Sequence, residues 1–536
     1  MTQSRREFMS LSAKAALLAL GMNAGLPTGL FAAAKTTGFD SPLPLPGGSG
    51  LYGLLAPKGN VALMATKVPG LLPATGAPML AYAATQGGKT FQNPVLVLRK
   101  GQQFNATLVN MLPEPTIIHW HGVDGPWRQA GHPSYAVGPG ESYDYSFPVT
   151  NRAGTYWYHP HPHGLTAKQS YYGLSSFFIV RDAEEEAFAK ELDLRLGVND
   201  IPVVLQDKRF TPDGQLDYSP SMEDLLMGYL GGSVLANGAL RPTMKVATRL
   251  YRFRVLNGST ARLYNLAFVQ GGKALPFVLV GNDGGFLPAP QRLTEVFLAP
   301  GERVDVLLDL RALAPGQEVF LQNLPFDPMH NEMGGMMGGM MGGGMGGGTG
   351  GGHESGGHGA LGEGDSYPIA RLLVERKQTY DRKIPAKLPA LAQPASGGPV
   401  RPIALAMRHM GGWTINGLTY AMGEAPIVVK KRGLETWQIH NPEASMPHPM
   451  HLHGYFYRVL ERRGSPAQVR SRAVDGQGRL ATDLGFKDTV LVWPGETVSL
   501  SIDFRTPNYP GEQLFLFHCH NLEHEDQGMM LNVRVL

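Results

Sequence analysis

The sequence contains a single cysteine, Cys519, among 536 residues. One cysteine excludes an internal disulfide, so disulfides neither stabilise this fold nor report its redox compartment. The chain also has little excess charge of either sign: it contains 47 basic and 44 acidic residues, so the formal net charge is only +3. This small charge gives no indication of a nucleic-acid partner.

Long apolar runs are also scarce. The run near the start, from Leu11 to Leu20, is too short to span a bilayer comfortably. It follows the basic stretch Ser4-Arg5-Arg6-Glu7-Phe8-Met9 and precedes the small residues Ala32-Ala33-Ala34. This pattern is typical of a twin-arginine export signal, which carries folded proteins out of the cytoplasm. We therefore expect residues 1–34 to direct export to the periplasm, without stable membrane insertion afterwards. A disordered basic N-terminus or a short membrane anchor is the alternative.

Glycine (69) and proline (42) are abundant, and short alternating runs follow one another along most of the chain. Residues 35–90 look irregular, but from Pro94 onward the runs alternate as strands do. The length suggests two to four domains, and the strand spacing favours β-sandwiches. Short helices are expected only near 183–193 and 222–230.

A Pro-Gly-Glu turn begins at Pro139, Pro300 and Pro494, each time just before a strand-like run. Three copies of one turn suggest that a single sandwich domain is repeated three times. The predicted domains are 35–185, 186–385 and 386–536, all of them β-sandwiches.

A methionine- and glycine-rich insert at 325–365 interrupts the second domain. A flexible linker is the plain interpretation. Thioethers are soft ligands that suit Cu(I), however, and exposed methionine oxidises readily. Glycine disfavours a stable helix here. The candidate ligands of the insert are Met329, Met333, Met336, Met337, Met340, Met341 and Met345, with His330, His353, Glu354 and His358 around them.

The histidines form four His-x-His pairs, two in the first predicted sandwich and two in the third. They are His119/His121, His159/His161, His451/His453 and His518/His520. Any single pair could be solvated or packed in a core. Four pairs, with the last enclosing the only cysteine, indicate a metal cluster where the two sandwiches meet.

The last pair also joins two sites. Side chains alternate along a strand, so His518 and His520 point one way and Cys519 the other. His448 lies three residues before His451, cannot share its face, and is free to join Cys519 and His524. Two histidines, one cysteine and Met529 as a weak axial ligand are the composition of a blue-copper site.

These motifs resemble the four copper-binding signatures of the three-domain multicopper oxidases, in both order and spacing. The resemblance covers essentially the whole chain after the export signal. It is strongest to the methionine-rich bacterial laccase-like enzymes that oxidise cuprous ions. The signatures are His119-Trp120-His121-Gly122, Trp157-Tyr158-His159-Pro160-His161, His448-Pro449-Met450-His451-Leu452-His453-Gly454 and His518-Cys519-His520 to Met529-Met530.

The resemblance implies an all-β fold of three cupredoxin-like Greek-key β-sandwich domains that hold four copper ions. Type 1 copper would be held by His448, Cys519, His524 and axial Met529. Type 2 copper would be held by His119 and His451. The two type 3 coppers would be held by His121, His159, His161, His453, His518 and His520. Spacing alone leaves any two of His159, His161 and His163 as ligands; the family pattern chooses the first two.

The implied reaction couples four one-electron oxidations to the four-electron reduction of O2 to water. Glu525 and Asp526 are the expected proton relay, with ordinary surface acids as the alternative. Many members of the family carry an Asp about ten residues after the first His-x-His pair, but this sequence has Ala130-Gly131 there, and Asp124 lies too early. No proton donor is therefore assigned in the first domain.

We expect an exported, monomeric enzyme that oxidises Cu(I), and small phenolic or aromatic amine donors, in copper tolerance. The insert is hypothesised to gather Cu(I) and to restrict larger organic donors. Met446, Met450 and Met530 flank the blue site, either as ordinary packing or for cuprous docking. The alternatives are a general laccase with an incidental insert, and a non-catalytic cell-envelope scaffold or copper store.

Overall fold

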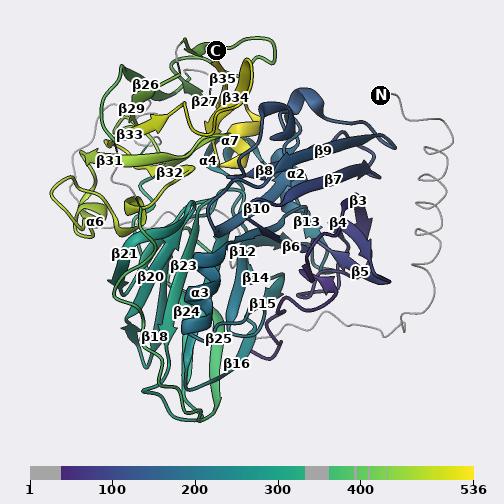
Figure 1. The fold of residues 1–536 in the computed structure, drawn as a ribbon, viewed down its shortest axis with the longest axis vertical. Helices are drawn as coiled ribbons and strands as arrows, with labels where there is room; N and C mark the ends of the chain where they lie inside the picture. Colours follow the sequence, from purple (N-terminus) through teal and green to yellow (C-terminus); the bar gives the residue numbers. More distant parts are fainter. Residues whose placement is uncertain (1–37, 332–360, 392–394, 409–410, 431) are drawn as a thin grey trace, which may run out of the picture. The chain divides into compact units, whose positions relative to one another are not determined.

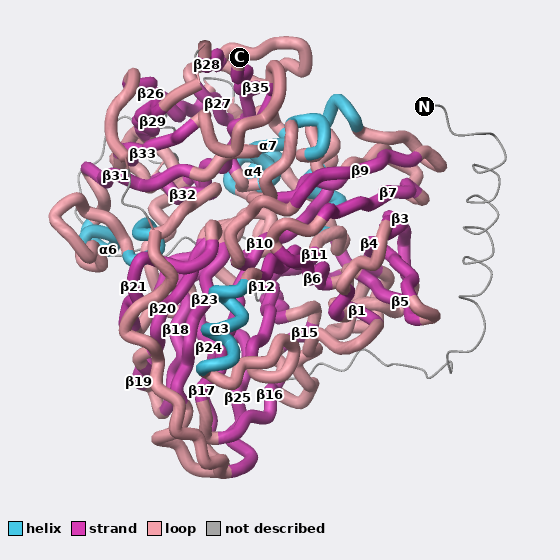
Figure 2. Tube along the Cα trace, in the orientation of Figure 1, coloured by secondary structure: helices cyan, strands magenta, loops and turns pink. Residues whose placement is uncertain are grey.

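Strands dominate the described part of the chain, and the helices there are short (Figure 2). The computed structural model describes residues 38–331, 361–391, 395–408, 411–430 and 432–536 (Figure 1). The predicted export signal and most of the methionine-rich insert lie outside these residues. Within the described ranges, no helix is long and apolar enough to cross a membrane.

The first pair of sheets spans residues 50–181. Its β3 buries Val61, Leu63 and Ala65 at every second position, as a half-buried strand requires. The expectation that residues 35–90 are irregular was wrong, because β3 and its neighbours pair there. One sheet has the order β1 (Gly50–Leu51), β5 (Lys89–Gln92), β4 (Met79–Gln86), β3 (Asn60–Val68), β7 (Gln103–Asn110) and β9 (Ser142–Pro148). The other has the order β2 (Leu54–Leu55), β6 (Val95–Arg99), β11 (Ser176–Arg181), β10 (Gly154–Pro160) and β8 (Ile118–His121).

The second pair spans residues 200–376. One sheet has the order β15 (Ala239–Leu240), β14 (Ser233–Ala236), β12 (Asp200–Phe210), β17 (Leu250–Asn257), β23 (Arg303–Asp309), β20 (Phe277–Asn282) and β21 (Gly285–Leu293), with β13 (Leu216–Asp217) beside β12. The other has the order β16 (Thr243–Ala247), β25 (Tyr367–Arg376), β24 (Glu318–Asn323), β18 (Tyr264–Gln270) and β19 (Lys273–Leu275), with β22 (Val296–Leu298) beside β18.

The third pair spans residues 400–535. One sheet has the order β27 (Trp413–Ile415), β26 (Val400–Met407), β29 (Leu434–His440), β33 (Thr497–Asp503) and β31 (Tyr457–Arg463). The other has the order β28 (Ile427–Val429), β35 (Met530–Val535), β34 (Gln513–Cys519), β30 (His448–Leu452) and β32 (Thr489–Val492).

Each pair of sheets has its own hydrophobic core, which confirms the all-β sandwich prediction. The strands of each pair lie inside one predicted domain, while the exact domain limits stay a prediction. The described helices are α2 (Thr166–Tyr171), α3 (Ala183–Glu191), α4 (Met222–Met227), α6 (Ala467–Arg470) and α7 (Leu522–Asp526), with 3-10 turns η1 (Trp127–Gln129), η2 (Pro133–Tyr135) and η3 (Ala481–Leu484). The short helices expected near 183–193 and 222–230 correspond to α3 and α4.

Candidate metal centres

Strand register brings the histidines of each sandwich together. In the first sandwich, His119 of β8 lies directly opposite His159 of β10. In the third, His451 of β30 lies opposite His518 of β34, and Met450 lies opposite Cys519. Directly opposed residues of antiparallel strands share a face, so each pairing presents two imidazoles on one side of its sheet.

The two sandwiches meet at these faces. The Nε2 atoms of His119 and His451 are 3.3 Å apart. The Nε2 atom of His518 lies 3.1 Å from that of His453 and 3.5 Å from that of His161. All eight histidines of the four pairs are buried. The predicted convergence of the four pairs is therefore present in the structure.

In four of these eight rings, the nitrogen that points away from the other histidines is hydrogen-bonded to a backbone carbonyl. The Nδ1 atom of His119 donates to the carbonyl of Ala130 (2.5 Å), and that of His451 donates to the carbonyl of Asp488 (2.7 Å). Those of His159 and His518 donate to the carbonyls of Pro160 and Cys519, both at 2.9 Å. Such bonds fix the tautomer and leave the opposite nitrogen as a bare acceptor.

The inner nitrogens lack comparable partners. Among the described residues, Nε2 of His159, Nδ1 of His121 and both ring nitrogens of His520 have no hydrogen-bond partner although they are buried. The His520 ring lies against Gly301, where an added Cβ would approach the ring to 2.9 Å at a φ of +83°. Buried nitrogens are rarely left without a partner, so these atoms fit nitrogens that bind a metal ion.

Burial also keeps seven of these eight imidazoles neutral. It lowers the pKa of His119, His121, His159, His451 and His453 far below the ordinary value, and neighbouring imidazoles add to the effect. It lowers the pKa of His161 to about 4 and that of His520 to about 3. Metal ligation requires neutral histidine. The donor set, its tautomers and its protonation therefore fit a copper cluster.

Asp488 is the residue of this site that the sequence interpretation missed. Its Oδ1 lies 3.1 Å from Nε2 of His121. The bond leaves Nδ1 of His121 facing the cluster, whereas Nε2 faces it from His119 and His451. Arg303 holds the carboxylate with two hydrogen bonds, the longer of them 2.7 Å.

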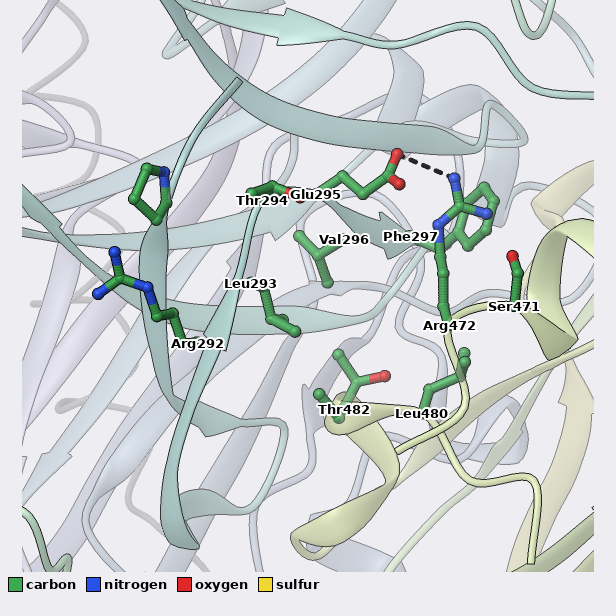
Figure 3. Close-up of a pocket in the computed structure, with 12 residues that line it drawn as sticks. Arg292, Leu293, Thr294, Glu295, Val296, Phe297, Ser471, Arg472, Leu480 and Thr482 are labelled. Carbon is green, nitrogen blue, oxygen red and sulfur yellow. Dashed lines mark hydrogen bonds and ion pairs between the residues drawn. The ribbon is translucent and has the colours of Figure 1, made fainter. Parts of the chain in front are cut away.

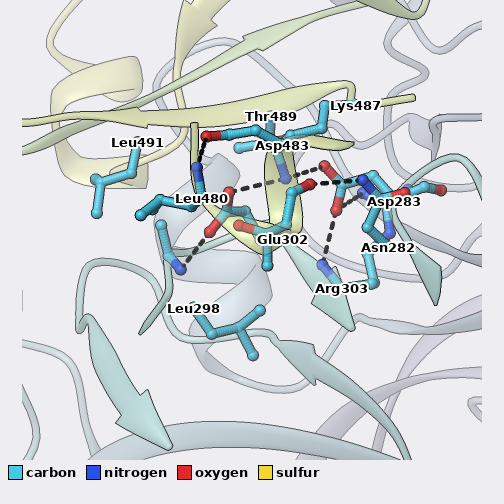
Figure 4. Close-up of polar contacts among 12 residues, drawn as sticks. Asn282, Asp283, Leu298, Glu302, Arg303, Leu480, Asp483, Lys487, Thr489 and Leu491 are labelled. Atoms are coloured by element: carbon cyan, nitrogen blue, oxygen red, sulfur yellow. Dashed lines mark hydrogen bonds and ion pairs between the residues drawn. The ribbon is translucent and has the colours of Figure 1, made fainter. Parts of the chain in front are cut away.

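Arg303 belongs to a buried network between the second and third sandwiches (Figure 4). Its backbone N–H donates to Asp283, which also pairs with Lys487 at 2.9 Å. Lys487 pairs in turn with Glu302 at 3.0 Å. Buried charges are retained only when paired, so this network fixes the position of Asp488.

The two acids predicted as a proton relay are not ordinary surface acids. Glu525 is buried, with Oε1 3.5 Å from Nε2 of His161 and Oε2 3.1 Å from Nδ1 of His518. Burial raises its pKa, but these histidines outweigh burial and hold the pKa well below its ordinary value. The Asp526 carboxylate instead accepts from the backbone N–H groups of Thr166 and Ala167, at the start of α2. Burial, and then the charge of Glu525, raise the pKa of Asp526.

The first domain offers only backbone groups at Ala130-Gly131, where the sequence resemblance implied an acid. The carbonyl of Ala130 accepts from His119, and Gly131 approaches β8 so closely that an added Cβ would lie 2.1 Å from the carbonyl oxygen of Ile118. Asp124 bonds to Thr150 instead. His163 is exposed and its ring contacts Tyr420, at 5.0 Å between centroids, so it lies outside the cluster.

A second donor set surrounds Cys519. Its Sγ lies 3.6 Å from Nδ1 of His448 and 3.6 Å from Nδ1 of His524. The strand β34 ends at Cys519, and His524 is carried by α7. Met529 is buried in the same core cluster, and its carbonyl accepts from the N–H of Cys519. Burial raises the pKa of the Cys519 thiol, so metal binding must displace a proton.

The carbonyl of Leu226 closes this second site from outside. It accepts from Nε2 of His524 at 2.8 Å and from Nε1 of Trp413 at 2.9 Å. The Trp413 ring packs against His448 and His524. The helix α4 thus fixes the tautomer of His524 and covers its edge. The flanking Met446, Met450 and Met530 are all buried, which favours the packing interpretation for them.

Only the two ends of the methionine-rich insert are described. His330 Nε2 lies 2.8 Å from Glu363 Oε2, which holds the two ends together. Asn331 donates from its backbone N–H to the carbonyl of Ser445, three residues before His448. Met329 packs against the hydrophobic cluster that includes Leu491 and Trp493. The candidate ligands Met333, Met336, Met337, Met340, Met341 and Met345 lie outside the described residues.

A separate cavity of about 460 Å³ lies between the second and third sandwiches (Figure 3). Glu295, Phe297, Arg472 and Thr482 are among the residues that line it. Arg472 lies over the Phe297 ring and pairs with Glu295 at 2.9 Å. None of the predicted copper ligands lines this cavity.

Comparisons with known proteins agree with this geometry. Two multicopper oxidase family profiles match residues 82–185 and 383–536. The McoA multicopper oxidase of Aquifex aeolicus has a similar structure, with a TM-score of 0.77 and 36% sequence identity over 92% of this chain and 99% of that one. A multicopper oxidase of Staphylococcus haemolyticus is 28% identical over 445 residues, which cover 82% of this chain and 81% of the relative. The cell division protein FtsP of Yersinia pestis is 29% identical over 449 residues, covering 82% of each chain.

Proposed function

The chain belongs to the multicopper oxidase family, and we propose that it oxidises Cu(I) and small aromatic donors and passes their electrons to O2. As an oxidoreductase of this family, it uses copper, O2 and a reducing substrate. The finer assignments are proposals: four copper ions, Cu(I) as a donor, and a part in copper tolerance.

One observation carries the proposal: His518, Cys519 and His520 join two buried donor sets at the end of one strand. Cys519 faces His448 and His524, while His518 faces the cluster histidines. Bound copper would supply the one-electron redox changes that couple a donor to O2. His448, Cys519, His524 and Met529 would hold the type 1 ion, and the eight paired histidines would hold the other three.

The chain supplies a short connection between the two sites. His518 and His520 are bonded directly to Cys519 through the backbone. The carbonyl of Cys519 also accepts a hydrogen bond from Nδ1 of His518 at 2.9 Å. Electrons entering at Cys519 can therefore reach the cluster through a peptide bond or through this hydrogen bond.

Glu525 is placed to deliver protons to the cluster. Its carboxylate lies between His161 and His518, and Asp526 follows it in α7. The two carboxyl groups have pKa values shifted in opposite directions, an arrangement typical of acid–base pairs. We propose that Asp526 holds a proton near the α2 terminus and that Glu525 carries protons to the side of the cluster formed by His161 and His518.

The position of the insert supports Cu(I) as a donor. Its first end is hydrogen-bonded through Asn331 to the segment that carries His448, and Met329 packs against the hydrophobic cluster that includes Trp493. The methionine-rich segment therefore begins beside a part of the chain that carries a predicted type 1 ligand, and its thioethers are soft ligands that suit Cu(I). His524 is fully buried beneath α4, which restricts direct contact with bulky donors.

The insert proposal is tested by removing residues 333–358, which keeps Met329 and the contact between His330 and Glu363. We expect Cu(I) turnover to fall far more than phenol turnover. A matched variant of full length, with the six methionines from Met333 to Met345 replaced by Leu, separates sulfur from length. Equal losses for both donors in both variants would favour a general laccase with an incidental insert.

A second candidate is the non-catalytic cell-envelope scaffold that the sequence left open, and the similarity to the cell division protein FtsP is the observation that favours it. The full set of predicted copper ligands disfavours it, because a scaffold has no need of ten buried histidines that converge, with Cys519, on two sites. Copper binding without O2 consumption would support this candidate.

Localisation stays a proposal based on residues 1–34. We propose export to the periplasm by the twin-arginine route, which delivers folded protein, and activity there as a monomer. Replacing Arg5 and Arg6 with Lys should retain the protein in the cytoplasm, as fractionation of expressing cells would show.

A further inference from the structure

A row of oxidisable aromatic rings leads away from the histidine cluster. It starts at Trp120, which lies between His119 and His121 in β8. The Trp120 ring is 5.2 Å from Tyr145, and Tyr145 is 5.0 Å from Tyr143, between ring centroids. The row continues from Tyr143 to Tyr135 at 5.6 Å and from Tyr135 to Trp127 at 5.2 Å.

Burial decreases along this row. Trp120 and Tyr145 are each 1% exposed, whereas Tyr143, Tyr135 and Trp127 are only partly buried. The inner end is one residue from two predicted copper ligands, and the outer end meets solvent. The row therefore connects the cluster with the surface of the first sandwich.

Hydrogen bonds hold two of the phenols in place. The Tyr145 hydroxyl donates to the carbonyl of Ile118 at 3.0 Å and accepts from its N–H at 2.9 Å. The Tyr143 hydroxyl donates to the carbonyl of Arg128. Burial raises the pKa of Tyr145 well above its ordinary value and that of Tyr143 to about 12, so both are protonated at neutral pH.

We propose that Trp120, Tyr145, Tyr143, Tyr135 and Trp127 form a protective route that carries oxidising equivalents from the cluster to the surface when donor is scarce. The inference rests on the proposed reduction of O2 at the histidine cluster. An enzyme that holds O2-derived oxidants in a dry site risks oxidation of its own ligands whenever electrons stop arriving. Rings in contact offer such an oxidant electrons that solution donors can replace.

The electron balance is closed by the donor. One electron leaves Tyr143 and passes through Tyr145 and Trp120 to the O2-derived oxidant, which is reduced by one electron. The phenol proton of Tyr143 passes to water at its exposed edge. The hole moves to Tyr135 or Trp127, where a phenol or Cu(I) from solution returns one electron. Water returns the proton, and each ring is restored.

Core packing alone would also gather aromatic rings, but it does not require hydroxyl groups. Trp120 has a second tyrosine neighbour, Tyr158, at 5.4 Å, which leads to Tyr82 at 5.3 Å. Both of these tyrosines are fully buried. That branch ends inside the core, so Tyr158 is a matched control for Tyr143.

The test compares copper-loaded wild type with Tyr143→Phe and Tyr158→Phe during O2 turnover with limiting phenol. Freeze-quench electron paramagnetic resonance detects tyrosyl and tryptophanyl radicals, and peptide mass spectrometry maps oxidised side chains. In wild type we expect oxidation at Tyr143, Tyr135 and Trp127. In Tyr143→Phe, oxidation at Tyr135 and Trp127 should be lost and should appear at Trp120 and the cluster histidines. Tyr158→Phe should match wild type.

An unchanged oxidation map in Tyr143→Phe, with normal copper content and O2 uptake, would overturn the route. A wild type that binds copper but consumes no O2 with any donor would overturn the proposed function, and the route with it. A second variant, Tyr135→Phe, guards against a folding defect in the first. It should stop oxidation beyond Tyr143 while leaving Tyr143 itself oxidised.

Discussion

Asp488 and His121 are 367 positions apart in sequence, yet Oδ1 of Asp488 lies 3.1 Å from Nε2 of His121. The contact joins the third sandwich to the first and assigns Nδ1 of His121 to the cluster. Arg303 of the second sandwich holds the same carboxylate. All three sandwiches therefore contribute to the position of one imidazole.

Replacement of Asp488 with Asn should weaken copper retention at the cluster. Hydrogen-bond partners of metal ligands typically change affinity by about 10–100-fold when mutated. Equilibrium dialysis of the copper-loaded protein measures the loss. Asp283→Asn disturbs the same buried network without touching a histidine and serves as the control. If both variants lost copper equally, the effect would belong to the ion network and not to His121.

Replacement of Cys519 with Ser should remove the type 1 ion and its blue absorption while leaving the cluster histidines in place. O2 uptake should fall to background because donor electrons enter through Cys519. Metal analysis and visible spectroscopy follow the change. His163→Ala, at an exposed histidine outside the cluster, should leave both unchanged. A blue band that survives in the Cys519→Ser variant would refute this assignment.

Glu525→Gln should slow O2 reduction to a much larger extent than it weakens copper binding at the cluster. The amide keeps the shape of the side chain but cannot transfer a proton, and removing such a group typically costs about 10²–10⁴-fold in rate. Steady-state O2 uptake with copper analysis tests this. The surface variant Glu512→Gln is the control, and a rate for Glu525→Gln equal to that of the control would exclude the relay.

Glu523 should make stability depend on pH. It is fully buried, and burial raises its pKa from 4.5 to about 7. Because the native state binds its proton more tightly than the unfolded state, this contribution to stability is full below about pH 4.5 and is lost as the pH rises to about 7. The Tm of copper-free Glu523→Gln, measured against pH, should decline less than wild type over this interval. Parallel curves for the two proteins would contradict the prediction.

Trp413→Phe should loosen the outer wall of the type 1 site. The variant keeps a ring against His448 but loses the hydrogen bond to the carbonyl of Leu226. One neutral hydrogen bond contributes about 0.5–1.5 kcal/mol, so a small decrease in Tm is expected. The electron paramagnetic resonance signal of the type 1 copper should also shift, because His524 donates to the same carbonyl. Trp437→Phe, at another buried indole of this core, should leave that resonance unchanged.

The donor residues could be predicted from sequence because their chemistry is rare and their spacing is local. Alternation around Cys519 separated two sites, and the structure places His448 and His524 on the cysteine side. The strands within 35–90 were missed because their small residues, such as Ala62 and Ala65, give a weak alternating signal. The predicted Cu(I)-binding role of the methionine-rich insert stays a prediction.

Asp488 and Leu226 could not be found in this way. Asp488 lies in an ordinary Lys-Asp-Thr stretch, and only the register of β32 against β30, which pairs Thr489 with His451, brings it to the cluster. Leu226 acts through its carbonyl, an atom that every residue has. Long-range pairing and backbone contacts leave no local pattern in the sequence.

Copper stoichiometry, measured together with the visible spectrum and O2 uptake, tests the central claim most directly. The purified protein is loaded with copper, and O2 uptake is followed with Cu(I) and then with a phenol as the only donor. We predict four copper ions per chain, a blue band that bleaches on addition of donor, and O2 uptake with both donors. Fewer than four ions, or a protein that binds copper but shows no blue band and consumes no O2, would contradict it.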